Sequence, residues 1–111
     1  MTIREIAAAL TLEVLCAERN LDQPILGGYA SDMLSCVMAG AKKDAIWVTL
    51  LTHLNVIAVA VLLEIPAVIV SEHAPVDAAV RQKAETEGIV LLHSAENTFT
   101  LVGKLYALGV R

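Results

Sequence analysis

The chain has 111 residues, of which 57% are hydrophobic, 4% are aromatic and 18% are charged, and its formal net charge at pH 7 is −4. This length predicts a single domain over residues 1–111 that is large enough to bury a core. The acidic balance, without any cluster of Lys and Arg, argues against a nucleic-acid partner. The mainly aliphatic composition favours a parallel sheet covered by helices, and the surplus of apolar residues favours a subunit interface.

The most apolar stretch, LNVIAVAVLLEIPAVIV, is interrupted by Glu64 and Pro66. Its unbroken apolar part, residues 56–63, is far shorter than the roughly 20 residues that a membrane-spanning helix needs, so we expect no membrane partner. The N-terminal segment lacks the charge pattern of a signal peptide, and Cys16 and Cys36 form no CxxC motif. These features predict a cytoplasmic protein, with Cys36 buried on the apolar face of a helix.

Hydrophobic periodicity and turn residues predict an alternation of helices and strands. In chain order the predicted elements are a helix over 2–9, a strand over 12–16, a short strand at 25–26, a helix over 32–39, a strand over 44–51, a helix over 55–64, a strand over 66–70, a helix over 76–87, a strand over 89–92 and a helix over 97–108. Thr2 and Glu5 are spaced as a capping box for the first helix, and Gly88 and Gly109 end the last two.

From residue 24 onward the strands and helices alternate with a spacing near 20 residues. Connections of this length favour parallel strands joined by right-handed crossovers. In the second helix, Met33, Cys36 and Val37 are expected to face inward. The predicted fold class is therefore α/β, a single-domain parallel sheet flanked by helices.

The stretch PILGGYASDMLSCVMAG, residues 24–40, leads from a short strand through two glycines into a helix. It is neither a P-loop nor a GxGxxG fingerprint. Gly27 and Gly28 are predicted to form a turn, and Ser31 or Asp32 to cap the helix. Anion binding by the free amides of the helix N-terminus is an alternative, although the Asp32 carboxylate would already use the helix dipole.

Ligands of open parallel sheets bind outside the carboxyl ends of the strands, and polar residues follow each predicted strand here. The expected ligand-binding residues are Gly28, Tyr29, Ser31, Asp32, Thr49, Thr52, His53 and Asn55. A metal site built from His53, His73 and His93 is a weaker alternative, and we expect no metal and no cofactor. Within one chain, two cysteines do not supply the four thiolates of an iron–sulfur cluster; two subunits together would supply four, which is a weaker alternative. No catalytic triad or carboxylate pair is evident, so we expect no enzymatic activity and no catalytic residues.

The run GGYASDMLSCVMAGAKKDAIWVTLLTHLNVIAVAVLLEIPAVIV resembles the DRTGG domain, in particular its small stand-alone members, and the resemblance extends over about residues 2–110. Domains of this type are similar to the N-terminal domain of HPr kinase/phosphorylase. The resemblance implies a parallel α/β sandwich that self-associates and serves in regulation or ligand sensing. Small relatives of this kind also look like proteins encoded near iron-only hydrogenases.

Two departures from the family pattern concern the motif itself. Asp32-Met33 stands in place of Asp-Arg, and Thr49-Leu50-Leu51 stands in place of Thr-Gly-Gly. We expect a non-catalytic regulatory or ligand-sensing module, a homodimer, that binds a small-molecule anion such as a nucleotide or phosphorylated metabolite at the carboxyl ends of the strands. The alternative is an accessory or scaffold protein that partners a redox enzyme complex of the iron-only hydrogenase type.

Overall fold

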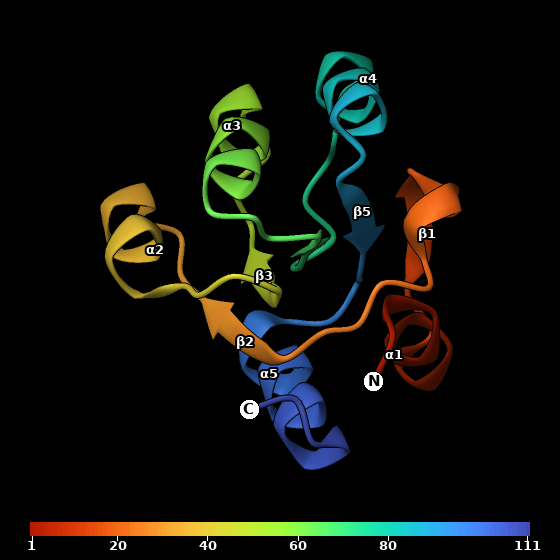
Figure 1. Cartoon of the computed structure of the whole chain (residues 1–111). Helices are drawn as coiled ribbons and strands as arrows, with labels where there is room; N and C mark the ends of the chain where they lie inside the picture. Colours follow the sequence, from red (N-terminus) through yellow and green to blue (C-terminus); the bar gives the residue numbers. More distant parts are fainter.

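The computed structural model describes all 111 residues, and its elements form three layers, with a sheet between two sets of helices (Figure 1). The helices are α1 (Ile3–Leu10), α2 (Leu34–Gly40), α3 (Leu54–Leu62), α4 (Ala78–Glu87) and α5 (Thr98–Leu108), with a short 3₁₀ turn, η1 (Glu18–Asn20). The strands are β1 (Glu13–Cys16), β2 (Gly27–Ala30), β3 (Ala45–Thr49), β4 (Ala67–Val70) and β5 (Val90–His93). This confirms the α/β class.

The five strands form one sheet in the order β1-β5-β4-β3-β2. Strands β2 to β5 are parallel, as predicted. Strand β1 lies antiparallel to β5, with Glu13 opposite His93, so the sheet is mixed rather than parallel throughout. No crossover helix joins β1 to β5, because the chain leaves β1 for the opposite edge of the sheet. The other four strands are parallel because a crossover helix joins each of them to the next. This constraint does not apply to β1, which can therefore lie antiparallel to β5.

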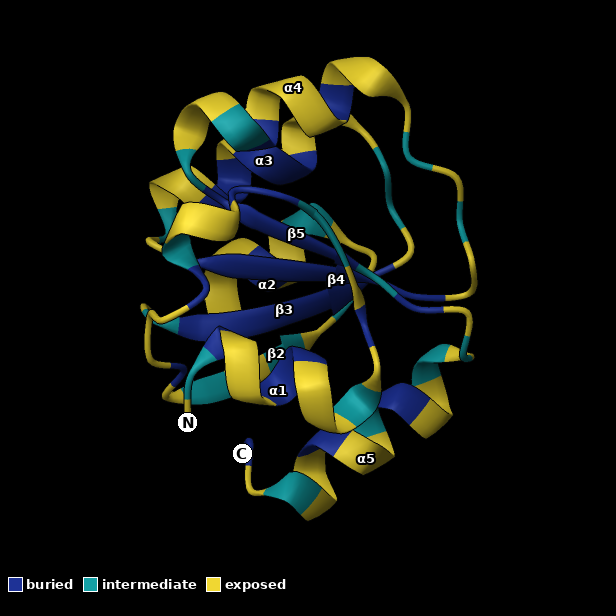
Figure 2. Cartoon of the chain, turned by 90° about the vertical axis from the view of Figure 1, so that its right-hand side faces the viewer, coloured by how far each residue is buried: buried dark blue, intermediate teal, exposed yellow.

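Helices α2, α3 and α4 cover one face of the sheet, and α1 and α5 cover the other (Figures 1 and 2). The crossovers from β2 to β5 all advance in one direction and share one hand, which places their helices on the same face. Helix α5 follows the last strand and packs beside α1 and against β3 on the opposite face. The connections that follow β4 and β5 therefore diverge to opposite faces, which makes the gap between these strands the topological switch point.

The core lies on both faces of the central strands, where every residue of β3 and β4 is buried (Figure 2). Its largest fully buried side chain is Trp47, and the rest of the core is mainly aliphatic. Strands buried on both faces read as continuous apolar runs, which is why these two were predictable. None of the helices combines the length and the apolar character needed to cross a membrane.

The helix ends agree with the sequence prediction where the signal is local. Thr2 caps α1, and Glu5 completes the capping box. Gly88 and Gly109 adopt the left-handed conformation just after α4 and α5. These caps depend only on residues three or four positions apart, so the sequence alone predicts them.

The region around α2 differs from the prediction. Gly27 and Gly28 form no turn but lie inside the edge strand β2, and α2 begins at Leu34 with no side chain capping its first turn. Val37 is buried, whereas Cys36 is exposed and Met33 is 60% exposed. Helix α2 is short and lies over the edge of the sheet, so only Val37 is buried in the core, with Leu34 packed half-buried against it.

Candidate functional site

The Asp32 carboxylate joins the ends of β2 and β3. Its Oδ1 accepts hydrogen bonds from Thr49 Oγ1 and from the Leu50 backbone N–H, both at 2.8 Å. Thr49 is fully buried, and its hydroxyl oxygen also accepts a bond from the Leu51 N–H at 3.1 Å. The Asp and Thr positions of the resemblance therefore meet in direct contact, and the carboxylate binds the neighbouring strand instead of capping α2.

Two further residues of the predicted site also use their polar groups locally. The Ser31 hydroxyl accepts a hydrogen bond from the Met33 N–H at 3.1 Å, and the Ser31 carbonyl accepts one from Trp47 Nε1 at 3.0 Å. The Tyr29 hydroxyl donates to the Cys36 carbonyl of α2 at 3.1 Å. These bonds fix the path of the chain from β2 into α2.

The loop between β3 and α3 carries the predicted residues whose side chains have no partner. Thr52 is half-buried, His53 and Asn55 are exposed, and the structure shows no hydrogen bond from any of these three side chains. His53 occupies the N-cap position of α3 without capping it. Gly28 lies inside β2 and faces the side of the sheet that carries α5, where its nearest neighbour is Val110. The structure therefore brings Ser31, Asp32 and Thr49 to one strand edge and places Gly28 apart from them.

A second part of the carboxyl edge lies at the switch point, where the segments after β4 and β5 hold each other through their backbones. The Glu72 N–H donates to the Glu96 carbonyl at 2.8 Å, and the His73 N–H donates to the Ser94 carbonyl at 3.0 Å. Glu72 and His73 both have left-handed backbones, with φ of 62° and 52°, which non-glycine residues adopt uncommonly. The mutual bonds hold this conformation in place.

Side chains add to this connection on the side of α5. The Ser71 and Thr98 hydroxyls lie 2.7 Å apart, and the Glu72 carboxylate accepts a hydrogen bond from the Thr98 N–H at 2.7 Å. Ser71 is fully buried. The bonds tie the start of α5 to the end of β4, so the two loops of the switch point form one connected unit.

A pocket of about 320 Å³ opens beside these loops, and we call it the switch-point pocket. It lies between β1, the start of α4 and the ends of β4 and β5, and its lining comprises Glu13, Leu15, His73, Pro75, Val76, Arg81 and His93. The rings of His73 and His93 are 5.2 Å apart between centroids. His93 Nε2 lies 2.8 Å from the Ala74 carbonyl, which makes this nitrogen the protonated one, and Nδ1 lies 3.8 Å from the Glu13 carboxylate.

Arg81 gives this pocket a cation without a carboxylate partner. Its one hydrogen bond, from Nη2 to the Leu15 carbonyl, is long at 3.4 Å, and it takes part in no ion pair. The Arg81 guanidinium and the His73 imidazole suit an anionic oxygen ligand. The His93 Nε2–H is already bonded to the Ala74 carbonyl, and Glu13 adds one carboxylate to the lining. The sequence places His73 and His93 at strand ends, but their neighbourhood depends on the strand order, which the sequence does not reveal.

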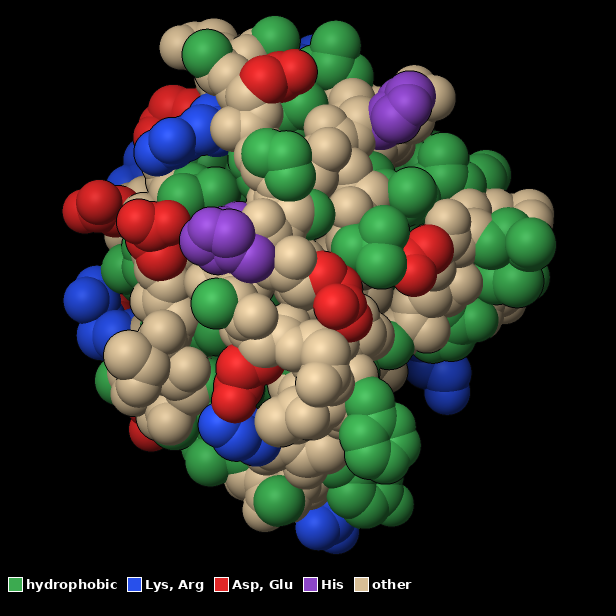
Figure 3. All heavy atoms as spheres, turned by 180° about the vertical axis from the view of Figure 1, so that it is seen from behind, with side chains coloured by type: hydrophobic (Ala, Val, Ile, Leu, Met, Phe, Trp, Pro, Cys, Tyr) green, Lys and Arg blue, Asp and Glu red, His purple; other side chains and the backbone are tan.

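The three histidines do not come together. Figure 3 shows histidine side chains at two separate places on the face that it presents. No group of three or more His, Cys, Asp or Glu side chains is placed to hold a metal ion. Cys16 is buried and Cys36 is exposed, and both are free thiols.

Comparison with known proteins supports the fold. No model of a known protein family matches the sequence, and no curated protein matches it. Among solved structures, the chain is similar to the CBS and DRTGG domains of the regulatory region of Clostridium perfringens pyrophosphatase, complexed with its activator diadenosine tetraphosphate, with a TM-score of 0.72 and 13% identity. The match covers 94% of this chain and 45% of that chain, so this chain spans less than half of its length. At this identity the likeness is one of fold.

Proposed function

We propose that the chain is a non-catalytic regulatory module of the cytoplasm that senses a nucleotide or phosphorylated metabolite at the carboxyl edge of its sheet. The observation that carries this proposal is the switch-point pocket, where the unpaired Arg81 lies with His73 and His93 at the place where α/β sheets bind ligands. The similar structure is that of a regulatory region in complex with a nucleotide activator, and its fold likeness to nearly the whole chain supports the same class of function.

The predicted residues at the ends of β2 and β3 belong to the same proposal. Thr52, His53 and Asn55 have side chains that are free to contact a ligand, whereas Asp32 and Thr49 hold the strand ends in position. Asp32 also places a negative charge at this half of the edge, which disfavours a phosphate directly against it. The proposal therefore puts the anionic group of the ligand at Arg81, and assigns Ser31, Tyr29 and Gly28 to the support of the β2 half.

Thermal unfolding of the full chain against a panel of nucleotides, phosphorylated metabolites and divalent metal ions tests this function. A ligand at 100 times its dissociation constant stabilises the folded state by about 2.7 kcal/mol, which produces a visible shift in Tm. For a ligand that binds at the switch-point pocket alone, the shift is expected to disappear in Arg81→Gln and to persist in Lys83→Gln, which removes the same charge from the exposed side of α4, where Lys83 pairs with Glu87. The absence of any shift across the panel would contradict the proposal.

Exposed apolar side chains on one side of the molecule indicate that the protein also binds a protein partner. Several apolar side chains on α2 and α3 and at the start of α2 are exposed. We call them the α2–α3 surface, and they are Met33, Met38, Leu54, Val61 and Leu62. Hydrophobic atoms gather over this side of the molecule (Figure 3). Exposed apolar patches mark interaction sites, and we assign this one to a second copy of the chain, which gives a homodimer.

Sedimentation of the wild type and of Leu62→Glu tests the homodimer. We expect a dimer that the charged substitution converts to a monomer, while a charged substitution at an exposed position elsewhere, Thr86→Glu on α4, leaves the dimer intact. A wild-type monomer would contradict self-association and would instead favour the accessory role in a redox enzyme complex, with the α2–α3 surface as the docking site.

A further inference from the structure

Some Lys and Arg side chains of this acidic protein form ion pairs with carboxylates, and others do not. Of its eight Lys and Arg residues, five form ion pairs with carboxylates, namely Arg4, Arg19, Lys43, Lys83 and Lys104. Three remain without a carboxylate: Lys42, Arg81 and Arg111. Arg81 belongs to the switch-point pocket, but Lys42 and Arg111 lie far apart in sequence and line one pocket together.

This basic pocket has a volume of about 450 Å³ and lies at the amino ends of β2 and β3, at the opposite edge of the sheet from the site proposed above. Its lining includes Lys42, Lys43 and Arg111 and contains no Asp or Glu. Lys43 pairs with Glu64 at 3.0 Å, but both side chains are more than 60% exposed, so this ion pair is weak. The Lys43 ammonium is therefore available to a ligand as a third cation.

Three glycines, Gly27, Gly28 and Gly40, form part of the wall of this pocket. A Cβ on Gly27 would lie 3.4 Å from the Arg111 carbonyl oxygen, and one on Gly28 would lie 3.3 Å from Val110 Cγ1. A Cβ on Gly40 would collide with the Tyr29 hydroxyl at 2.6 Å. These positions expose backbone rather than side chains, and β2 has a neighbouring strand on one side only, so its free edge carries unpaired backbone groups.

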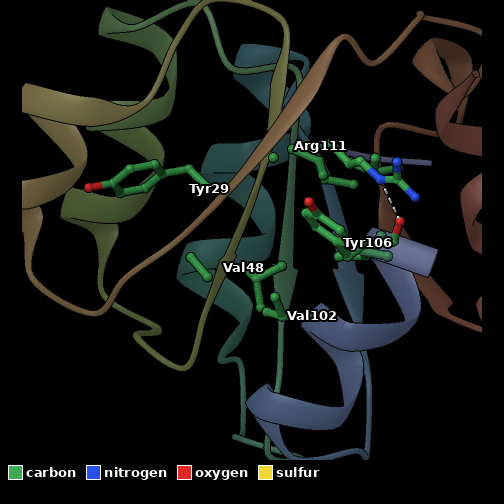
Figure 4. A pocket seen from close by; sticks show the side chains of 10 residues that line it. Tyr29, Val48, Val102, Tyr106 and Arg111 are labelled. Carbon is green, nitrogen blue, oxygen red and sulfur yellow. Dashed lines mark hydrogen bonds between the residues drawn. The ribbon is translucent and has the colours of Figure 1, made fainter. Parts of the chain in front are cut away.

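A second, apolar pocket of about 170 Å³ adjoins the basic one, and the two share Gly28 and Arg111. Its walls include Val48 from β3 and Val102 and Tyr106 from α5 (Figure 4). The Arg111 guanidinium lies 4.6 Å from the centroid of the Tyr106 ring, and Arg111 Nε donates a hydrogen bond to the Tyr106 carbonyl at 3.1 Å. Arg111 therefore lies at the junction of an apolar and a cationic compartment.

We infer that this cleft along β2 binds a small molecule that joins a flat apolar ring to one or more phosphates, the chemistry of a nucleoside phosphate. The volume of the basic compartment falls in the range of small-molecule sites. Its three cations suit phosphate oxygens, and the apolar compartment beside Tyr106 suits the ring. The site is separate from the carboxyl edge and uses none of the charged residues proposed there.

Isothermal titration of the full chain with ADP, pyrophosphate and adenosine tests the inference. ADP is expected to bind at least tenfold more tightly than either fragment, because it fills both compartments. Lys42→Gln and Arg111→Gln are each expected to weaken ADP binding by about tenfold, the effect of losing one charge-assisted hydrogen bond. Tyr106→Ala is expected to weaken the binding of ADP but not that of pyrophosphate.

Two controls separate this site from the switch-point pocket. Lys83→Gln, a cation paired on another face, is expected to leave ADP binding unchanged. Arg81→Gln is expected to remove binding at the switch-point pocket only and to keep the ADP binding that depends on Lys42 and Arg111. If Arg81→Gln abolishes ADP binding while Lys42→Gln and Arg111→Gln do not, the cleft along β2 is not the site and the carboxyl-edge proposal stands. If ADP binds no better than pyrophosphate, or if neither binds the wild type, the inference is overturned.

Discussion

The Oδ1 atom of Asp32 links the segment after β2 to the end of β3 and to the loop that follows β3. Its acceptance of bonds from Thr49 Oγ1 and the Leu50 N–H explains why an acidic residue occupies the carboxyl edge of a module proposed to bind anions. Hydrogen bonds to a charged acceptor contribute more than neutral ones. The role is structural, and it sets the position of the residues that follow, Thr52 and His53.

We expect Asp32→Ala to lower the free energy of unfolding by about 1–2 kcal/mol, because it leaves the buried Thr49 hydroxyl without its acceptor. Asp32→Asn keeps an oxygen in place and should retain most of this stability. Urea denaturation of the two variants measures the difference. Equal stabilities for Asp32→Ala and the wild type would show that the contact is dispensable.

The two thiols differ in environment, and we expect them to differ in reactivity. Burial is the main cause that raises the pKa of the Cys16 thiol, whereas Cys36 is exposed. Because the thiolate is the reactive species, iodoacetamide at pH 8 should alkylate Cys36 quickly and Cys16 only after unfolding, as followed by mass spectrometry. Equal rates for the two thiols in the folded protein would contradict the burial of Cys16.

At the scale of elements, Glu85 of α4 anchors the segment that leaves β1. Its carboxylate accepts a hydrogen bond from the Ala17 N–H at 3.0 Å and pairs with Arg19. Ala17 has a left-handed backbone, with φ of 59°, so this segment depends on outside contacts to keep its conformation.

The bond to the Ala17 backbone and the bond to Arg19 lower the pKa of Glu85 from its ordinary value of 4.5. A lowered folded-state pKa contributes stability above the unfolded value, and this contribution is lost as the pH falls through the folded value. Denaturation between pH 7 and pH 3 should therefore show a smaller acid-induced loss of stability in Glu85→Gln than in the wild type. Parallel curves for the two proteins would show that this carboxylate does not contribute.

The sequence predicts correctly those elements whose conformation is determined by residues close to them in the chain. The caps at Thr2 and Gly88 and the continuous apolar runs of β3 and β4 depend on neighbours in the chain. The glycines of β2 depend on Val110 and Arg111, some eighty residues away, and a local pattern of two glycines before a helix indicates a turn instead. For the same reason Asp32 resembles a helix cap until its distant partner, Thr49, is known.

At the scale of the whole molecule, strand order decides which residues of the candidate site meet. Each polar group at a strand end is visible in the sequence, but the divergence between β4 and β5 appears only when α5 is seen on the opposite face of the sheet. It places His73 and His93 beside Arg81, whereas His53 follows β3 and belongs to another part of the edge. The fold brings the three cations that form no ion pair, Lys42, Arg81 and Arg111, to two pockets at opposite edges of the sheet.

A titration of the ¹⁵N-labelled chain with ADP, followed by amide chemical shifts, is the sharpest test that the protein senses phosphorylated ligands at the carboxyl edge of its sheet. We expect a saturable response at the ends of β4 and β5, residues 71–76 and 93–98, that Arg81→Gln removes. A simultaneous response at residues 26–28 and 40–45 would report the second site along β2. Shifts confined to the α2–α3 surface, or no saturable shift at all, would contradict the assignment of this chain as a sensor of phosphorylated ligands.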